Sequence, residues 1–512
     1  MKDTRFFLCS VCAVFVFVCG SVFGAGGVLP GDGSEGNPYV IEDIADFNEF
    51  ADPANSAVYW AGGVHTQLGC DIDLSGLSYS QAVIGPDTDI TSINFQGTAY
   101  SGSFDGCGFE VAGLTIDDDN VGESFVGLFG YVDGGTVENV GVVDCSISVG
   151  VDGGTANHSV QSAGAVCGGV YNGTVSNCYS TGVIMVDVSS SGRVDIFSIG
   201  GVVGSFWGTM SGSWSECAIT CTGSSSSYAN LDRIGGLVGH AEGWLSDCYA
   251  TGAIEVNIVK GGTGSYINYY LHQIGGLIGK NYDGTIERCY ASGDVSAAAE
   301  CYSYAVTHAI GGLVGYNTGH TSDSYSVGNV TASAAGDSRY GSSYRVGGLM
   351  GSNQSEVVNC YAAGGVSASA TGSINNIKEV GGLCGLNNGS FSACFWDTEV
   401  SGMVTSAGGT GKTTAEMSSE TMYVSAGWDF DDTDGSADWR MGSTYPMLIW
   451  EEVNVVDLEE LALLAEYWGM SGCAVGEACA EVDWYVDGAI DILDMCQLAG
   501  SWLGAEVSVS GS

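Results

Sequence analysis

The sequence predicts an all-β protein: a parallel β-solenoid of about eight coils, followed by a small α-helical domain at the C-terminus. The main observation is an internal repeat, IGGLVG, at Ile234–Gly239. Close copies begin at Ile199, Ile274, Ile310, Val346 and Val380, 34 to 40 residues apart. Weaker copies near Phe125 and Gly164–Gly168 bring the total to eight. A period of this length indicates stacked repeat units.

A second landmark follows six of the eight copies, as NCYSTG, DCYATG, RCYASG, DSYSVG, NCYAAG or ACFWDT. Between the landmarks lie short alternating segments and Gly, Asn and Ser turns, which are typical of strands rather than helices. The composition agrees, since the 512 residues include 82 Gly and only 5 Pro. One such unit cannot bury its own apolar face, so we expect the copies to stack into a solenoid over residues 121–400.

The first 25 residues are predicted to be a secretory signal peptide. Lys2 and Arg5 precede an apolar run over residues 6–18, and small residues follow up to Ala25. No other segment reaches 18 apolar residues, so no transmembrane segment is expected in the mature chain. We therefore expect an exported protein, located outside the cell or on its surface.

Residues 26–120 are predicted to form an N-terminal cap and the first coils. Glu42–Ala51 is expected to form a short helix over the open end of the stack, because an exposed sheet edge needs a cover. At the other end, residues 401–450 are predicted to be a linker and a C-terminal cap that includes Trp428–Trp450.

Two neighbouring columns emerge when the repeats are aligned. The first contains Cys178, Cys248, Cys289, Cys360 and Cys394 and accepts Val140 and Ser324, so we expect small side chains that face the core. Stacked coils would bring these sulfurs close together, but parallel side chains give poor torsion angles for a disulfide. A ladder of free thiols is the expectation, and bridging of some of them remains the alternative.

The next residue on a regular strand points outward, and it forms an aromatic column. Its members are Tyr179, Tyr249, Tyr290, Tyr325, Tyr361 and Phe395. A second set lies six residues before the repeat start, at Tyr228, Tyr304 and Tyr340, with Tyr269 and Tyr270 nearby. Outward aromatic rows can bind sugar rings, or they can stack on one another and stabilise the coils. Both roles stay open for the first column, whose six residues are the candidate ligand-binding residues.

The repeat over residues 120–400 resembles the GLUG repeat of bacterial secreted and surface proteins. That resemblance implies surface display and recognition, and it does not by itself imply catalysis.

The C-terminal residues change composition and contain a duplication with an offset of 34. Leu461, Leu464, Ala465 and Trp468 follow helical spacing, as do their counterparts before Trp502. The segment Asp483–Asp494, DWYVDGAIDILD, has the rhythm of a calcium-binding loop. The predicted ligands are the carboxylates of Asp483, Asp487, Asp491 and Asp494 and the backbone carbonyl of Ala489. The alternative is a two-helix cap whose acidic residues are only solvated.

Residues 451–504 thus resemble a type I dockerin, with 505–512 as a tail. The resemblance implies binding of Ca²⁺ and docking to a cohesin-like module on a scaffold or surface. The first loop departs from the pattern, because Ile449, Glu451, Val453 and Asn454 occupy ligand or bend positions. One calcium site is therefore expected, in the second loop.

A formal net charge of −47 excludes a nucleic-acid binder that relies on electrostatic attraction. The sequence favours a non-catalytic recognition or adhesion rod that binds carbohydrate or another surface and is tethered by its dockerin-like tail. The alternative is a carbohydrate-active enzyme, a polysaccharide lyase or hydrolase on a β-helix with the same targeting module. No catalytic residue is assigned, because stacked coils can assemble an active site without a local motif.

Overall fold

The structure is a computed structural model that describes residues 29–89, 94–118, 125–151, 157–260, 268–336, 340–430 and 437–451. It is 56% strand and 6% helix and forms a parallel β-solenoid of about eight turns, which confirms the predicted fold class. The predicted signal peptide and nearly all of the dockerin-like domain lie outside the described residues. The chain divides into two units, residues 1–427 and 428–512, and the solenoid belongs to the first.

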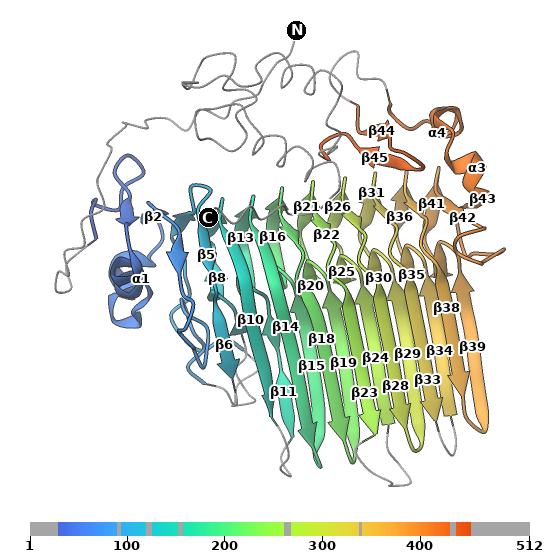
Figure 1. Cartoon of the computed structure of the whole chain (residues 1–512), viewed down its shortest axis with the longest axis horizontal. Helices are drawn as coiled ribbons and strands as arrows, with labels where there is room; N and C mark the ends of the chain where they lie inside the picture. The colour runs from blue at the N-terminus through green and yellow to red at the C-terminus, as the bar shows by residue number, and fades with distance from the viewer. Residues whose placement is uncertain are drawn as a thin grey trace, which may run out of the picture. The chain divides into compact units, whose positions relative to one another are not determined.

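Each coil has three faces joined by tight corners (Figure 1). In one coil, β19 (Tyr228–Gly235) leads into β20 (Val238–Ala241) and β21 (Trp244–Ser246). The chain then turns into β22 (Tyr249–Ala250) and β23 (Ile254–Lys260) before the next coil begins at β24 (Asn268–Gly275). Every strand pairs in parallel with its counterpart one coil away, for example Ile234 with Ile274.

The first face, which carries β20 and β21, is a 17-stranded sheet. Its other strands are β1 (Tyr39–Ile41), β2 (His65–Leu68), β4 (Ser103–Asp105), β8 (Phe129–Asp133), β9 (Thr136–Glu138), β13 (Cys167–Ser176), β16 (Val203–Ser211), β25 (Ile278–Asn281), β26 (Thr285–Glu287), β30 (Val314–Asn317), β31 (His320–Ser322), β35 (Met350–Asn353), β36 (Glu356–Val358), β40 (Cys384–Asn387) and β41 (Ser390–Ser392).

The second face carries β22 and β23. Its other strands are β3 (Ile72–Asp73), β5 (Glu110–Ala112), β6 (Thr115–Asp118), β10 (Gly141–Val151), β14 (Tyr179–Ser190), β17 (Trp214–Ser215), β18 (Ala218–Ser225), β27 (Tyr290–Ala291), β28 (Val295–Cys301), β32 (Tyr325–Ser326), β33 (Val330–Gly336), β37 (Tyr361–Ala362), β38 (Val366–Thr371), β42 (Phe395–Asp397) and β43 (Thr410–Lys412).

The third face is a nine-stranded sheet that contains β19 and β24. Its other strands are β7 (Phe125–Val126), β11 (His158–Val160), β12 (Ser162–Ala163), β15 (Arg193–Gly200), β29 (Tyr304–Gly311), β34 (Tyr340–Gly347) and β39 (Ile374–Gly381).

Short helices lie near the two ends of the stack. The predicted N-terminal helix is confirmed as α1 (Ile44–Ala51), which is capped by the carboxylate of Asp43 and buries Phe47 and Phe50. The 3-10 helix at Pro53–Asn55 and α2 (Ser56–Tyr59) follow it. After the last coil come α3 (Thr414–Met417) and α4 (Glu420–Ser425), in which Met417 and Tyr423 are buried.

The three glycines of IGGLVG are required by the corner between the third and first faces. A Cβ on Gly235 would lie 2.2 Å from the carbonyl oxygen of Val238, and one on Gly236 would lie 2.2 Å from the carbonyl oxygen of Gly276 in the next coil. A Cβ on Gly239 would lie 2.4 Å from the carbonyl carbon of Ser198 in the preceding coil. Backbone atoms therefore occupy the space that any side chain would need.

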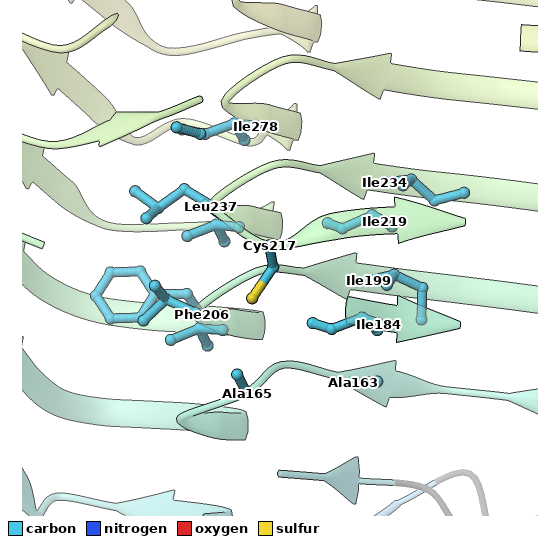
Figure 2. Close-up of a cluster of buried hydrophobic side chains, with 14 of the residues drawn as sticks. Ala163, Ala165, Ile184, Ile199, Phe206, Cys217, Ile219, Ile234, Leu237 and Ile278 are labelled. Carbon is cyan, nitrogen blue, oxygen red and sulfur yellow. The ribbon is translucent and has the colours of Figure 1, made fainter. Parts of the chain in front are cut away.

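The apolar residues of the same motif fill the interior. Ile234, Leu237 and Val238 are fully buried, and Figure 2 shows Leu237 between Ile278 and Phe206 of the neighbouring coils, and Ile234 near Ile199 of the preceding coil. The rod is therefore held together by columns of apolar side chains that repeat from coil to coil.

A buried asparagine ladder runs through four consecutive coils of the first face. The amide nitrogen of Asn281 donates to the side-chain oxygen of Asn317 at 2.8 Å, and Asn317 donates to Asn353 at 2.9 Å. Asn353 donates in turn to Asn387 at 3.0 Å. The first three side chains are fully buried, so each amide satisfies the next in a place that water does not reach.

Within the second unit, β44 (Trp439–Met441) and β45 (Pro446–Leu448) form an antiparallel pair, and the Trp428 and Trp439 rings lie 4.5 Å apart.

In the part of the chain that the structure describes, no helix has the length and apolar character needed to cross a membrane.

Candidate functional site

The NCY landmark marks a sharp turn into the second face. Its first residue has a positive φ in successive coils, for example Asn177 at 51° and Asn359 at 51°. Asn and Asp tolerate this left-handed conformation better than most other residues. The turn directs the following cysteine into the core, as the sequence predicts, and the next residue joins the aromatic column.

The cysteine column is a ladder of buried, unbridged thiols. Cys178, Cys248, Cys289, Cys360 and Cys394 are all free and almost fully buried. Burial raises the pKa of the Cys178 thiol to about 12, so it stays protonated and can donate to the carbonyl oxygen of Ser176, 3.3 Å away. The expected thiol ladder is therefore observed rather than the bridged alternative.

The first aromatic column is a continuous parallel stack. Tyr249 and Tyr290 have ring centroids 4.9 Å apart with an interplanar angle of 0°, Tyr290 and Tyr325 are 5.0 Å apart, and Tyr325 and Tyr361 are 4.8 Å apart. Each inner ring therefore has both faces covered by its neighbours.

Exposure falls toward the C-terminal end of this column. Tyr179, Tyr249 and Tyr290 are half-buried, whereas Tyr325, Tyr361 and Phe395 are buried. Phe395 continues the register after Tyr361, and its ring packs edge-on against Tyr423 of α4 at 5.7 Å. This geometry favours the stabilising role over sugar stacking, because a sugar ring would need a free aromatic face.

The column has a further member that was not predicted from the sequence. Trp214 stacks between Tyr179 at 4.5 Å and Tyr249 at 5.5 Å. The signal was present, because Trp214 lies 35 residues after Tyr179 and 35 before Tyr249, but its coil lacks the cysteine of the landmark.

The second aromatic set has a different geometry. Tyr228, Tyr270, Tyr304 and Tyr340 form a row across consecutive strands of the third face, with centroids 5.3 to 6.0 Å apart and interplanar angles of 41 to 57°. All four side chains are half-buried. Tyr269, the fifth candidate, points inward and is fully buried. We refer to these four tyrosines as the tilted row. The rings are not parallel, so they cover one another only in part, and the Arg193 guanidinium lies over the Tyr228 ring at 4.6 Å from its centroid.

The corner between the third and first faces gathers ionisable groups in low-exposure positions. Burial raises the pKa of Asp232 and lowers that of His272. Burial, helped by Arg233 and Lys280, lowers the pKa of His240 to about 3. His308 lies against His272, with ring centroids 5.2 Å apart, and burial with the neighbouring His272 lowers its pKa to about 4. The histidines are therefore neutral at physiological pH.

The predicted calcium ligands Asp483, Asp487, Ala489, Asp491 and Asp494 lie outside the described residues, so the calcium site stays a prediction. Across the described ranges, no group of three or more His, Cys, Asp or Glu side chains is arranged to hold a metal ion.

Parts of this chain are similar to a known repeat family and to two known proteins. The sequence model of the GLUG motif matches residues 232–257 and 270–296, which are two consecutive coils. A segment of 189 residues, 35% of this chain, is 30% identical to halomucin from Haloquadratum walsbyi, and the match spans 2% of that protein's length. A solved structure described as "a putative immunoglobulin A1 protease from Bacteroides ovatus" aligns with 82% of this chain and 95% of its own, with 18% identity and a TM-score of 0.33.

Proposed function

We propose that this chain is an exported, non-catalytic recognition rod whose solenoid binds neutral polysaccharide along its third face. The observation that carries the proposal is the tilted row, Tyr228, Tyr270, Tyr304 and Tyr340, which presents partly free ring faces at a regular spacing. The GLUG motifs and the similarity to halomucin support surface display, and the N-terminal 25 residues support export.

The ligand class follows from charge and from ring chemistry. A chain with a net charge of −47 repels polyanions, so uronate-rich or sulfated polymers are disfavoured. Tyrosine rings offer an apolar face for the C–H side of a sugar and a hydroxyl for its polar edge. Repetition on consecutive coils lets several weak contacts act on one polymer, which raises the overall affinity.

The first column enters this proposal as a stabilising element. Its rings cover one another, so the predicted ligand-binding role of Tyr179, Tyr249, Tyr290, Tyr325, Tyr361 and Phe395 is assigned in our proposal to the tilted row.

The C-terminal tail supplies the second part of the proposal. Its dockerin-like loop, with Asp483, Asp487, Asp491 and Asp494, would hold one Ca²⁺ and anchor the chain to a cohesin-like module on a scaffold or surface. This part rests on the sequence alone.

The test incubates the full exported chain with a panel of insoluble neutral polysaccharides and measures retained protein and released reducing ends in the same samples. We expect retention without release, and loss of retention in a Tyr304→Ala/Tyr340→Ala double variant. Tyr282→Ala is the matched control, because that side chain is 44% exposed and lies outside both aromatic sets.

Two results would overturn the proposal. Release of reducing ends would replace it with the carbohydrate-active enzyme. Equal retention of the double variant and the control would remove the tilted row as the binding surface.

A further inference from the structure

A cavity of about 550 Å³ lies at the corner between the third and first faces in the early coils of the solenoid. Phe197 reaches it from β15 on the third face, and Ser205 and Trp207 reach it from β16 on the first. Because side chains on both sides of the corner line one cavity, the corner is concave there. A cavity of this size is in the range of small-ligand sites.

One wall of the cavity is a fixed aromatic cluster. Phe95 stacks on Tyr131 with ring centroids 4.6 Å apart and an interplanar angle of 12°, and Phe125 packs edge-on against Tyr131 at 4.9 Å. Beneath them, a Cβ on Gly169 would lie 2.8 Å from the Phe125 ring and 2.9 Å from the Tyr131 ring. The missing side chain at Gly169 therefore lets these rings lie against the sheet, and packing holds them in place before any ligand arrives.

The opposite wall carries Phe197 and Trp207. The Arg233 guanidinium lies 5.3 Å from the Phe197 ring centroid, and the Trp207 ring meets His240 edge-on at 5.2 Å. Both aromatic side chains are half-buried, so part of each ring faces the cavity.

Neutral hydrogen-bonding groups complete the lining. They include the hydroxyl of Ser205, which is 6% exposed and lies 3.0 Å from the hydroxyl of Ser162, and the amides of Asn94 and Gln161. Arg233 is the one cation among the lining side chains that the structure describes, and it is paired with Asp232 at 3.3 Å. With Asp133 also in the lining, the site has no excess positive charge to attract an anion.

The geometry points to a discrete, open binding site for a single neutral pyranose sugar, between the Phe95–Tyr131 wall and the Phe197–Trp207 wall. The apolar C–H face of the sugar contacts an aromatic ring, and its hydroxyls bond to Ser205, Gln161 and Asn94. Ser205 and Gln161 bond to Ser162 and Ser159 within the protein, and the further hydrogen-bonding capacity of a hydroxyl and an amide suits a ligand with hydroxyl groups better than an apolar one. The inference rests on the proposed function only in that both require neutral glycan as the ligand, since the cavity and the tilted row share no residue.

The experiment uses the full exported chain and four probes: the methyl glycosides of glucose, galactose and mannose, and N-acetylglucosamine. Binding is measured by saturation-transfer NMR with each sugar at about 10 mM, which suits the millimolar affinity expected for one sugar ring. We expect transfer to at least one sugar, and a reduction of roughly tenfold or more in affinity in Trp207→Ala, because a buried aromatic contact is lost.

The matched control is Trp244→Ala, which removes a tryptophan that is 49% exposed on the same face and outside the cavity. Gln161→Ala is a second variant that keeps both aromatic walls and should weaken binding by a smaller factor. If Trp207→Ala does not fold, Gln161→Ala and Asn94→Ala test the site through its polar groups alone.

The inference is overturned if none of the four sugars shows transfer, or if Trp207→Ala and Gln161→Ala bind them as the unmodified chain does. The Tyr304→Ala/Tyr340→Ala variant separates the two proposals. Sugar binding that persists in this variant while polysaccharide retention is lost supports both sites. Loss of sugar binding in it would show that the tilted row, and not the cavity, holds the sugar.

Discussion

His240 should make the corner of the solenoid sensitive to acid. Its side chain is 8% exposed, and neither ring nitrogen has a hydrogen-bond partner among the described residues. Arg233 and Lys280 oppose a positive charge on the ring, and Glu242, at 3.6 Å, is the nearest carboxylate. Protonating this imidazole therefore costs more in the folded coil than in the unfolded chain.

The magnitude follows from proton linkage. The folded pKa is about 3, against 6.5 for the unperturbed side chain, so the unfolded chain binds a proton first as the pH falls. Stability is complete above pH 6.5 and is lost as the pH falls from 6.5 toward 3. By pH 5 the loss is about 2 kcal/mol, which is a ~25-fold increase in the population of the locally open coil.

The assay is hydrogen exchange measured by mass spectrometry on peptides from 238–246, at pH 7 and pH 5, with protection factors corrected for the intrinsic rates. A local measurement is needed because repeat proteins open coil by coil. The comparison is His240→Gln, which cannot take up the proton. On going from pH 7 to pH 5, the protection factors of the unmodified chain should fall ~25-fold more than those of His240→Gln.

Protonation of the many carboxylates affects the unmodified chain and His240→Gln alike. The difference in their loss of protection therefore reports on His240. His320→Gln, at a side chain 40% exposed, is a matched control that should behave like the unmodified chain. Equal losses of protection in the unmodified chain and His240→Gln would refute the reasoning.

Three further predictions concern the coils and the tail. Gly236→Ala places a Cβ 2.2 Å from a carbonyl oxygen of the next coil, so we expect a destabilisation of at least about 2 kcal/mol and a lower melting temperature. The control Gly36→Ala, which has open space around the new Cβ, should melt like the unmodified chain. Tyr290→Leu loses two parallel ring contacts and should cost about 1–3 kcal/mol in denaturant titration; a cost no larger than that of Tyr282→Leu would argue against the stabilising column. Asp491→Asn should reduce the calcium bound per chain from one to none in equilibrium dialysis, and an unmodified chain that binds none would refute the predicted loop.

The repeat period of the solenoid could be predicted, because every coil places the same steric requirements on the same few positions. Each coil needs glycine where backbones meet, as at Gly235 and Gly239, and a small residue where Cys178 enters the core, so the requirements appear in the sequence at fixed intervals. The backbone path at the corner between the third and first faces could not be predicted. It depends on a positive φ of 64° at Arg233, and arginine gives no sequence signal for that conformation.

The candidate sites were predicted less completely, for two physical reasons. Ring orientation within a column depends on side-chain packing, so the sequence could not show that the rings around Tyr290 are parallel whereas those around Tyr304 are tilted. The cavity contains residues that do not repeat. Phe95, Tyr131 and Trp207 come from separate coils and share no column, so a search for periodicity passes over them.

The asparagine ladder constrains how such a chain can grow in evolution. An asparagine that arises by point mutation in one buried coil finds no amide next to it and is selected against, because a buried amide without a partner is destabilising. Duplication of a coil that already contains one, such as the 36 residues from Asn281 to the residue before Asn317, adds a donor and an acceptor together. We therefore expect the ladder to lengthen by whole coils, and a chain engineered with one additional copy of residues 281–316 should fold with its extra amide bonded at both ends.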